Sequence, residues 1–138
     1  YSSSIVNELI SNNNFYEKIE MFNCCPECLI FVDKLRIGQV IDNIINNSYK
    51  YANTIIQISY ELNETHLTVF FKDFGSGVNE EELPLIFNKF YRGTNAKEVT
   101  GTGLGLFLSG YFMEHMQGDI ECYNISEGFV VKINIKLA

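Results

Sequence analysis

Two patterns of apolar and polar positions divide the chain into expected strands and expected helices. Residues 54–62 alternate apolar and polar side chains, and the next apolar segment, 66–74, follows after a polar pair, so together they predict a β-hairpin. Apolar residues recur at helical spacing from about Lys34 to Tyr51, and Asp33 is a good N-cap in front of them. The other expected elements are a short helix within 2–14, strands at 16–22 and 29–32, helices at 80–88 and 104–116, a loop at 92–102, and paired strands at 119–125 and 128–137.

The order of these elements predicts an α/β (α+β) two-layer sandwich. The strands are not regularly separated by crossover helices, which disfavours a doubly wound parallel sheet. We expect a mixed, mainly antiparallel sheet of about five strands, with about three helices on one face.

Composition and charge narrow the possible class of protein. Hydrophobic residues make up 46% of the 138 residues, so one domain with a real core can form. The formal net charge of -7 disfavours nucleic-acid binding, which needs a basic face. No apolar run approaches the ~20 residues that span a bilayer, and no signal peptide is visible. We expect no direct membrane contact by this domain.

Three of the four cysteines lie within residues 24–28, and the fourth is Cys122. Cys25 and Cys28 have the C-x-x-C spacing of a redox motif or a zinc knuckle. No second C-x-x-C exists and no histidine lies nearby in sequence, so a four-ligand zinc site would need distant partners. The alternative is reduced cysteines that are partly buried as small apolar groups.

The expected helix at 34–51 carries an unusual polar face. Asn43, Asn46, Asn47 and Lys50 fall together on a helical wheel, apart from a face of isoleucines. Asparagine is a mediocre helix former, so another requirement must favour it here. An asparagine oxygen can ligate Mg²⁺ and a lysine can neutralise phosphate, although asparagines could also simply cover a solvent-exposed face.

Two glycine-rich segments favour a nucleotide site. Residues 72–77 follow a hydrophobic strand, and residues 101–106 open a helix. Glycines let the backbone approach a ligand, and a helix N-terminus offers unpaired N–H groups to phosphate. Asp73, at a strand end, can accept a hydrogen bond from an exocyclic amine such as that of adenine.

Three common nucleotide motifs do not fit these segments. No lysine follows Gly105 as a Walker P-loop requires, and the spacing G-x-G-x-G follows a loop instead of the strand of a Rossmann fingerprint. The Asp73-Phe74-Gly75 triplet spells the D-F-G of eukaryotic-type kinases, but the H-R-D motif and the strand lysine of those enzymes are absent.

In order, these segments resemble the catalytic, ATP-binding domain of sensor histidine kinases, in the superfamily of gyrase, Hsp90 and MutL ATPases. The N box corresponds to 33–52, the G1 box to 73–78, the F box to 86–93 and the G2 box to 101–106. The resemblance implies the Bergerat-type fold for residues 16–138, with 1–15 as a linker or the end of an upstream helical dimerisation domain. Phe74, where asparagine or arginine is common, and Gly110, inside the last helix, depart from the pattern.

The resemblance also implies a role for each box residue. Asn47 would ligate Mg²⁺ on the phosphates of ATP, and Asn43 would line the same site. Lys50 would neutralise phosphate charge, Tyr51 would border the nucleoside, and Asp73 would bind the adenine amino group. The further implied site residues are Gly75 and Gly77 beside the base, Gly101, Thr102, Gly103, Leu104 and Gly105 in the ATP lid, Phe87 and Phe90 packing the lid, and Arg92 near the γ-phosphate or the partner histidine.

The implied function is a histidine kinase activity without its phosphoacceptor. His66 begins an expected strand and His115 lies near a helix end, so neither has the context of an acceptor histidine. We expect the γ-phosphate to pass to a histidine on a dimerisation domain outside this chain, with a response regulator as a further partner in a two-component signal-transduction system. The isolated chain should be a monomer that binds ATP with little turnover. Its parent would be a homodimeric membrane-bound sensor, with this domain in the cytoplasm.

Three other functions stay open. A conformational-switch ATPase of the gyrase and Hsp90 group would carry a glutamate base where this chain has Asn43. A serine kinase resembling anti-sigma factors would have a weaker F box than residues 86–93. A degenerate scaffold domain would not need intact Asn47 and Asp73, and Mg²⁺-dependent ATP affinity would separate it from the others.

Overall fold

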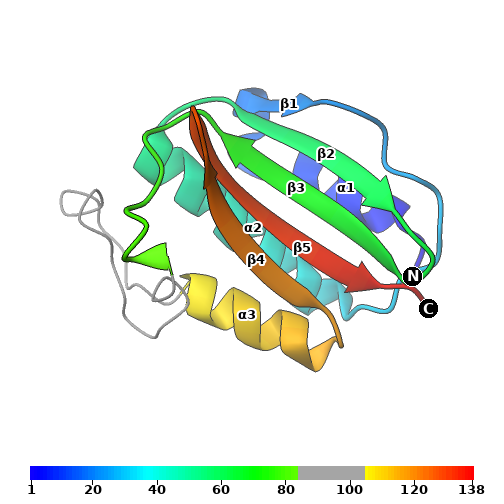
Figure 1. Cartoon of the computed structure of the whole chain (residues 1–138). Helices are drawn as coiled ribbons and strands as arrows, with labels where there is room; N and C mark the ends of the chain where they lie inside the picture. The colour runs from blue at the N-terminus through cyan, green and yellow to red at the C-terminus, as the bar shows by residue number, and fades with distance from the viewer. Residues whose placement is uncertain (84–104) are drawn as a thin grey trace.

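The computed structural model describes residues 1–83 and 105–138, and all three of its α-helices cover the same face of one five-stranded sheet (Figure 1). The predicted two-layer sandwich is therefore confirmed. In chain order the elements are α1 (Ser4–Ser11), the 3₁₀ turn η1 (Tyr16–Lys18), β1 (Ile19–Met21), α2 (Lys34–Ala52), β2 (Ile56–Leu62), β3 (His66–Asp73), α3 (Gly105–His115), β4 (Asp119–Ile125) and β5 (Gly128–Lys136).

The sheet is mixed and mainly antiparallel, as the sequence predicts. Its strand order is β1-β2-β3-β5-β4. Only β1 and β2 run parallel, while β2–β3, β3–β5 and β5–β4 are antiparallel. Both hairpins predicted from the alternating pattern are present, and β5 places the second hairpin beside the first.

Side chains of alternate strand residues face the helices and form the core. α2 contributes its isoleucine face to this core, and α1 adds three fully or nearly buried side chains. The core residues from these elements are Ile5, Val6 and Ile10 of α1, Ile37, Val40, Ile41, Ile44 and Ile45 of α2, Ile56, Ile58 and Tyr60 of β2, Leu67, Val69 and Phe71 of β3, and Phe129, Val131, Ile133 and Ile135 of β5.

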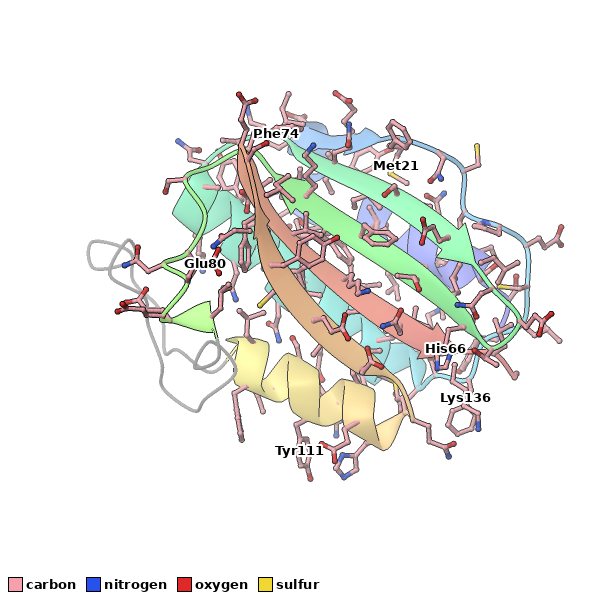
Figure 2. All side chains as sticks on the ribbon, in the orientation of Figure 1. Met21, His66, Phe74, Glu80, Tyr111 and Lys136 are labelled. Carbon is pink, nitrogen blue, oxygen red and sulfur yellow. The ribbon has the colours of Figure 1, made fainter. Side chains whose placement is uncertain are left out.

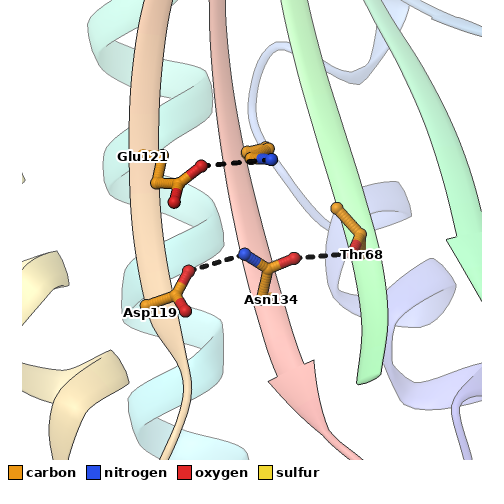
Figure 3. A network of polar contacts seen from close by, with 5 residues as sticks. Thr68, Asp119, Glu121 and Asn134 are labelled. Carbon is orange, nitrogen blue, oxygen red and sulfur yellow. Dashed lines mark hydrogen bonds and ion pairs between the residues drawn. The ribbon is translucent and has the colours of Figure 1, made fainter. Parts of the chain in front are cut away.

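The opposite face of the sheet carries a polar ladder (Figure 3). Asn134 of β5 donates to Asp119 of β4 and accepts from Thr68 of β3, both at 2.6 Å. Lys132 of β5 and Glu121 of β4 form an ion pair at 3.1 Å, and they are the next cross-strand pair on this face after Asn134 and Asp119. These contacts link three neighbouring strands on the face that none of the described helices covers.

The ends of α2 follow local rules. Asp33 accepts a hydrogen bond from the backbone N–H of Arg36 at 3.1 Å, which confirms it as the N-cap. Asn53, with φ 53°, adopts the left-handed conformation that commonly ends a helix, and its N–H bonds the carbonyl of Tyr49. The helix is therefore stopped next to the start of β2.

Two of the strand predictions are wrong in extent. Residues 16–22 begin with the 3₁₀ turn, and only Ile19–Met21 pair with β2. Residues 29–32 form no strand, because Leu29 and Ile30 make single bridges to different partners, Ser2 and Leu137. Leu29 pairs with a residue near the N-terminus and Ile30 with a residue near the C-terminus. Consecutive residues that pair with different segments do not form a continuous strand pairing.

The predicted helix at 80–88 can be followed only to residue 83, through a turn at residues 80–82. The rest of it, and the loop predicted at 92–102, lie outside the described residues. The last predicted helix, 104–116, is described from Gly105 to His115, and its expected first residue, 104, lies outside the described residues. In the described part of the chain no helix is long and apolar enough to cross a membrane.

Candidate functional site

The end of β3 places one carboxyl group in a buried position. Asp73 is the last residue of that strand and is 5% exposed. Its Oδ1 accepts a hydrogen bond from the N–H of Gly75 at 3.0 Å. Burial raises the pKa of the Asp73 carboxyl, and backbone hydrogen bonds from Gly75 and Phe129 oppose that shift. The carboxyl is therefore oriented by the backbone and poorly solvated, which strengthens any hydrogen bond that it accepts from a ligand.

The segment after Asp73 lies directly against the end of α2. A Cβ added to Gly75 would lie 2.7 Å from the Cβ of Ala52, which is too close for any side chain. The N–H of Phe74 also donates to Oγ1 of Thr54, one residue beyond the C-cap of α2, at 3.0 Å. The structure thus brings together the 33–52 and 73–78 segments that the sequence predicts to share a site.

Gly77 lies further along the same segment, in a turn that favours glycine. Its φ is 78°, and a Cβ would lie 2.5 Å from Oδ1 of Asn124 on β4. The next residue, Val78, donates its N–H to the same Oδ1 at 2.8 Å. The segment is therefore held at both ends, by α2 near Gly75 and by β4 near Val78.

The asparagine face of α2 divides into two parts with different surroundings. Asn46 accepts a hydrogen bond from Nδ2 of buried Asn13 at 3.2 Å, and that Nδ2 also donates to Asp42 at 2.8 Å. Asn46 therefore secures the loop after α1. By contrast, the half-buried carboxamide of Asn47 bonds to no other described residue, which leaves its oxygen available to a ligand.

Asn43, one turn before Asn47, is half-buried, and Lys50 is exposed near the helix end. Neutral amide oxygens, one lysine and a buried carboxyl are a donor set that fits Mg²⁺ and an adenine nucleotide. The residues present on α2 and at the end of β3 therefore suit that group.

Of the other predicted site residues, Tyr51 lies in the last turn of α2 and Gly105 is the first residue of α3. The remaining predicted residues, Phe87, Phe90, Arg92, Gly101, Thr102, Gly103 and Leu104, lie outside the described part of the chain.

Sequence reasoning missed two residues that hold the site together. Thr54 and Asn124 both bond to the backbone after Asp73, from a loop and from the end of β4. A lone asparagine in a strand gives no signal in sequence, because its partners lie 46 residues away. For Thr54, the position just after a helix C-cap was the only available clue.

The histidines and cysteines make local contacts. His115 Nδ1 lies 2.9 Å from the carbonyl oxygen of Tyr111, and His66 Nδ1 lies 2.7 Å from Oγ1 of Thr65. Figure 2 shows His66 at the end of the sheet opposite Phe74, so it is remote from Asp73. Cys25 donates its S–H to the carbonyl of Ser3, and burial raises the pKa of its thiol. Among residues 1–83 and 105–138, no three His, Cys, Asp or Glu side chains cluster as a metal site would require.

The chain is similar in sequence to a known sensor kinase. The sensor protein kinase GraS of Staphylococcus aureus (strain JH1) is 35% identical over 81 residues, which make up 57% of this chain and 23% of GraS. The chain therefore spans less than a quarter of the length of this relative.

Solved structures of histidine kinases have the same fold. The mycobacterial sensor histidine kinase MprB superposes with a TM-score of 0.85 over 99% of this chain and 97% of that chain, at 17% identity. A nucleotide-free catalytic domain of the histidine kinase ThkA superposes with a TM-score of 0.75 over 96% and 94% of the two chains, at 26% identity.

A family model also matches the chain, over residues 32–138, which include every described element from α2 onward. This match covers well over half of the sequence. The chain therefore belongs to the family of histidine kinase-, DNA gyrase B- and HSP90-like ATPases, with the fold of histidine kinase catalytic domains.

Proposed function

We propose that this chain binds MgATP and donates the γ-phosphate to a histidine on a separate dimerisation and phosphoacceptor domain. The observation that carries the proposal is the position of Asp73. Its buried carboxyl lies at the end of β3, and the backbone that follows it packs on Ala52, in the helix that carries Asn43, Asn47 and Lys50.

Asp73 would recognise the base. The backbone N–H of Gly75 orients its carboxyl, and the remaining acceptor capacity is open to an exocyclic amine. A base such as guanine has a carbonyl oxygen where adenine has its amino group. Two hydrogen-bond acceptors, this oxygen and the Asp73 carboxylate, would then lie opposite each other without a proton between them. Asp73 would therefore favour adenine over guanine, because an unpaired buried acceptor is costly.

The polar face of α2 would bind the phosphates. Bound MgATP supplies the phosphoryl group, and its metal ion neutralises charge on the phosphate oxygens. Asn43 and Asn47 lie one helical turn apart, and Lys50 lies three residues further along the same helix. Asn47 would supply an oxygen ligand, Asn43 would line the site beside it, and Lys50 would hold a phosphate oxygen by charge. Such positioning accounts for most of the catalysis in phosphoryl transfer.

The isolated chain would turn ATP over slowly. Asn43 cannot act as a general base, because a carboxamide has no basic group near neutral pH. The likeness to GraS, which is named a sensor protein kinase, supports a parent that is a homodimeric membrane-bound sensor with a response regulator as partner. In that parent, this domain would lie in the cytoplasm and supply the phosphoryl donor.

The direct test is calorimetric titration of the purified chain with ATP, with Mg²⁺ and with EDTA. We expect saturable binding that weakens when Mg²⁺ is removed, and loss of binding in an Asp73→Ala variant that remains folded. Tight ATP binding by that folded variant would contradict the proposal. So would brisk ATP hydrolysis by the chain alone, because the second substrate would then not be needed.

A further inference from the structure

We infer that Asn124 is a positioning residue for the base end of the nucleotide site, an inference that rests on the proposed function. Asn124 lies near the end of β4, the edge strand furthest from β1. Its carboxamide contacts the segment that follows Asp73, although the two residues are 51 positions apart in the sequence.

The sheet puts Asn124 and Asp73 in one row. Phe129 of β5 pairs with Asp73 of β3 on one side and with Asn124 of β4 on the other. Residues that pair directly across neighbouring strands point to the same face of a sheet. Asp73, Phe129 and Asn124 therefore all point to the face that the helices cover, and Asn124 is separated from Asp73 by one strand.

Asn124 binds both backbone groups of one residue. Its Oδ1 accepts the N–H of Val78 at 2.8 Å, and its Nδ2 donates to the carbonyl oxygen of Val78. The same Nδ2 lies 3.2 Å from Oε1 of Glu80. A carboxamide that accepts from the backbone N–H and donates to the C=O of one residue makes the same hydrogen bonds as a neighbouring strand. It therefore fixes the orientation of the backbone at Val78 as well as its distance from β4.

This contact fixes the turn at Gly77 as well. The Oδ1 of Asn124 occupies the space where a Cβ of residue 77 would lie, at 2.5 Å. With Gly75 held against Ala52 at the other end, the backbone from Asp73 to Val78 crosses the end of the sheet as a fixed arch (Figure 1). The base that Asp73 binds would lie against this arch.

A purely stabilising role makes a different prediction. Asn134 is another carboxamide on the sheet with two hydrogen bonds, to Thr68 and Asp119, but it faces the opposite side (Figure 3). Replacing either asparagine removes hydrogen bonds that join strands or segments. Only the Asn124 replacement releases the arch, so the pair separates positioning from general stability.

The experiment compares Asn124→Ala with Asn134→Ala in the whole chain, by calorimetric titration with ATP and with GTP and by thermal unfolding. We expect the Asn124→Ala variant to bind ATP about tenfold more weakly, a loss equivalent to one or two hydrogen bonds. Its preference for ATP over GTP should fall, because the orientation of the arch around the base is lost. The Asn134→Ala variant should bind both nucleotides like the parent, even if its melting temperature drops.

Asn124→Asp provides a second variant in case the alanine variant fails to fold. Aspartate has the same shape and still accepts from Val78 N–H, but it cannot donate to the carbonyl of Val78 and it repels Glu80. We expect it to weaken ATP binding at least as much. If the parent binds ATP, and a folded Asn124 variant binds ATP as tightly and with the same ratio of ATP to GTP affinity, this inference is overturned while the proposed function stands. If the parent binds no ATP, the proposed function is overturned and this inference with it.

Discussion

The backbone of Gly75 lies against the side chain of Ala52, with space for a hydrogen atom and nothing larger. This contact joins the C-terminal end of α2 to the turn that follows β3. It brings the backbone that follows the buried Asp73 against the C-terminal end of the helix that carries the asparagines.

Replacing Gly75 by alanine should damage both stability and nucleotide binding. The added methyl group would lie 2.7 Å from the Cβ of Ala52, so the turn must move away from α2. We expect a loss of about 1–3 kcal/mol in the free energy of unfolding, and weaker ATP binding. Urea denaturation and calorimetric titration measure the two effects.

Gly38→Ala, on the same helix, is the control. There the added Cβ would meet the flexible side chain of Leu9 at 3.3 Å, and alanine favours a helix over glycine by up to about 1 kcal/mol. We expect little change in stability and none in binding. If Gly75→Ala behaves like this control, the contact with Ala52 does not determine the geometry of the site.

Alanine substitutions at the neighbouring residues Asn46 and Asn47 should have different effects, one on the stability of the fold and the other on ATP binding. Both alanine substitutions gain the same helix propensity, but only Asn46→Ala removes one of the two acceptors of the Asn13 amide, the other being Asp42. We expect Asn46→Ala to be less stable than Asn47→Ala by about 1 kcal/mol in chemical denaturation. Conversely, Asn47→Ala should weaken Mg²⁺-dependent ATP binding about tenfold, while Asn46→Ala leaves it nearly unchanged. Equal ATP affinities of the two variants would remove Asn47 from the proposed metal site.

Asp73 should cost stability at neutral pH. Because burial raises its pKa in the folded chain above the ordinary value of 3.8, the folded state holds its proton more tightly than the unfolded state. Stability therefore falls as pH rises from 3.8 through the pKa of the folded state. We expect Asp73→Asn to be more stable than the parent at pH 7, with the difference vanishing below pH 3.8.

Urea denaturation across this pH range measures the effect, and calorimetry at pH 7 should show that the more stable Asp73→Asn variant binds ATP more weakly. A variant that is less stable than the parent at pH 7 would mean that the hydrogen bonds from Gly75 and Phe129 outweigh the burial of the charge.

The first fifteen residues should fold with the rest of the chain. Ile10 of α1 is fully buried in the common core, so Ile10→Ala should cost about 2–5 kcal/mol. Glu8→Ala, at an exposed position of the same helix, should change stability by less than about 0.5 kcal/mol. Equal stabilities of the two variants would support the sequence-based prediction that residues 1–15 are a linker or the end of an upstream helical dimerisation domain.

The sequence was sufficient where a local pattern determines the structure. The range of α2 follows from its apolar period and from the Asp33 cap, and both hairpins follow from alternating residues and polar turns. The proximity of Asp73 to the asparagine helix came from the family resemblance, and the contact between Gly75 and Ala52 agrees with it.

What the sequence could not determine depends on distant partners. Asn46 and Asn47 look alike on a helical wheel, and only the position of Asn13 distinguishes them. No local sequence pattern marks Asn124, because its contacts with Val78 form only when β4 pairs with β5 in the folded sheet. The apolar residues 29–32 predict a strand, but their pairing depends on where the chain termini lie.

The bridges of residues 29–30 leave both chain termini side by side (Figure 1). Ile30 binds the carbonyl of Tyr1, Leu29 accepts from the N–H of Ala138, and Leu137 bonds to Thr65, next to the end of β3 that is furthest from Asp73. A pair of fluorophores fused to the two ends would thus stay close together in the folded chain and far from the proposed nucleotide site at Asp73. Energy transfer between the fluorophores would decrease when the chain unfolds and would not depend on whether a nucleotide is bound. The same labelled termini could therefore be used to measure the stability of every variant described above.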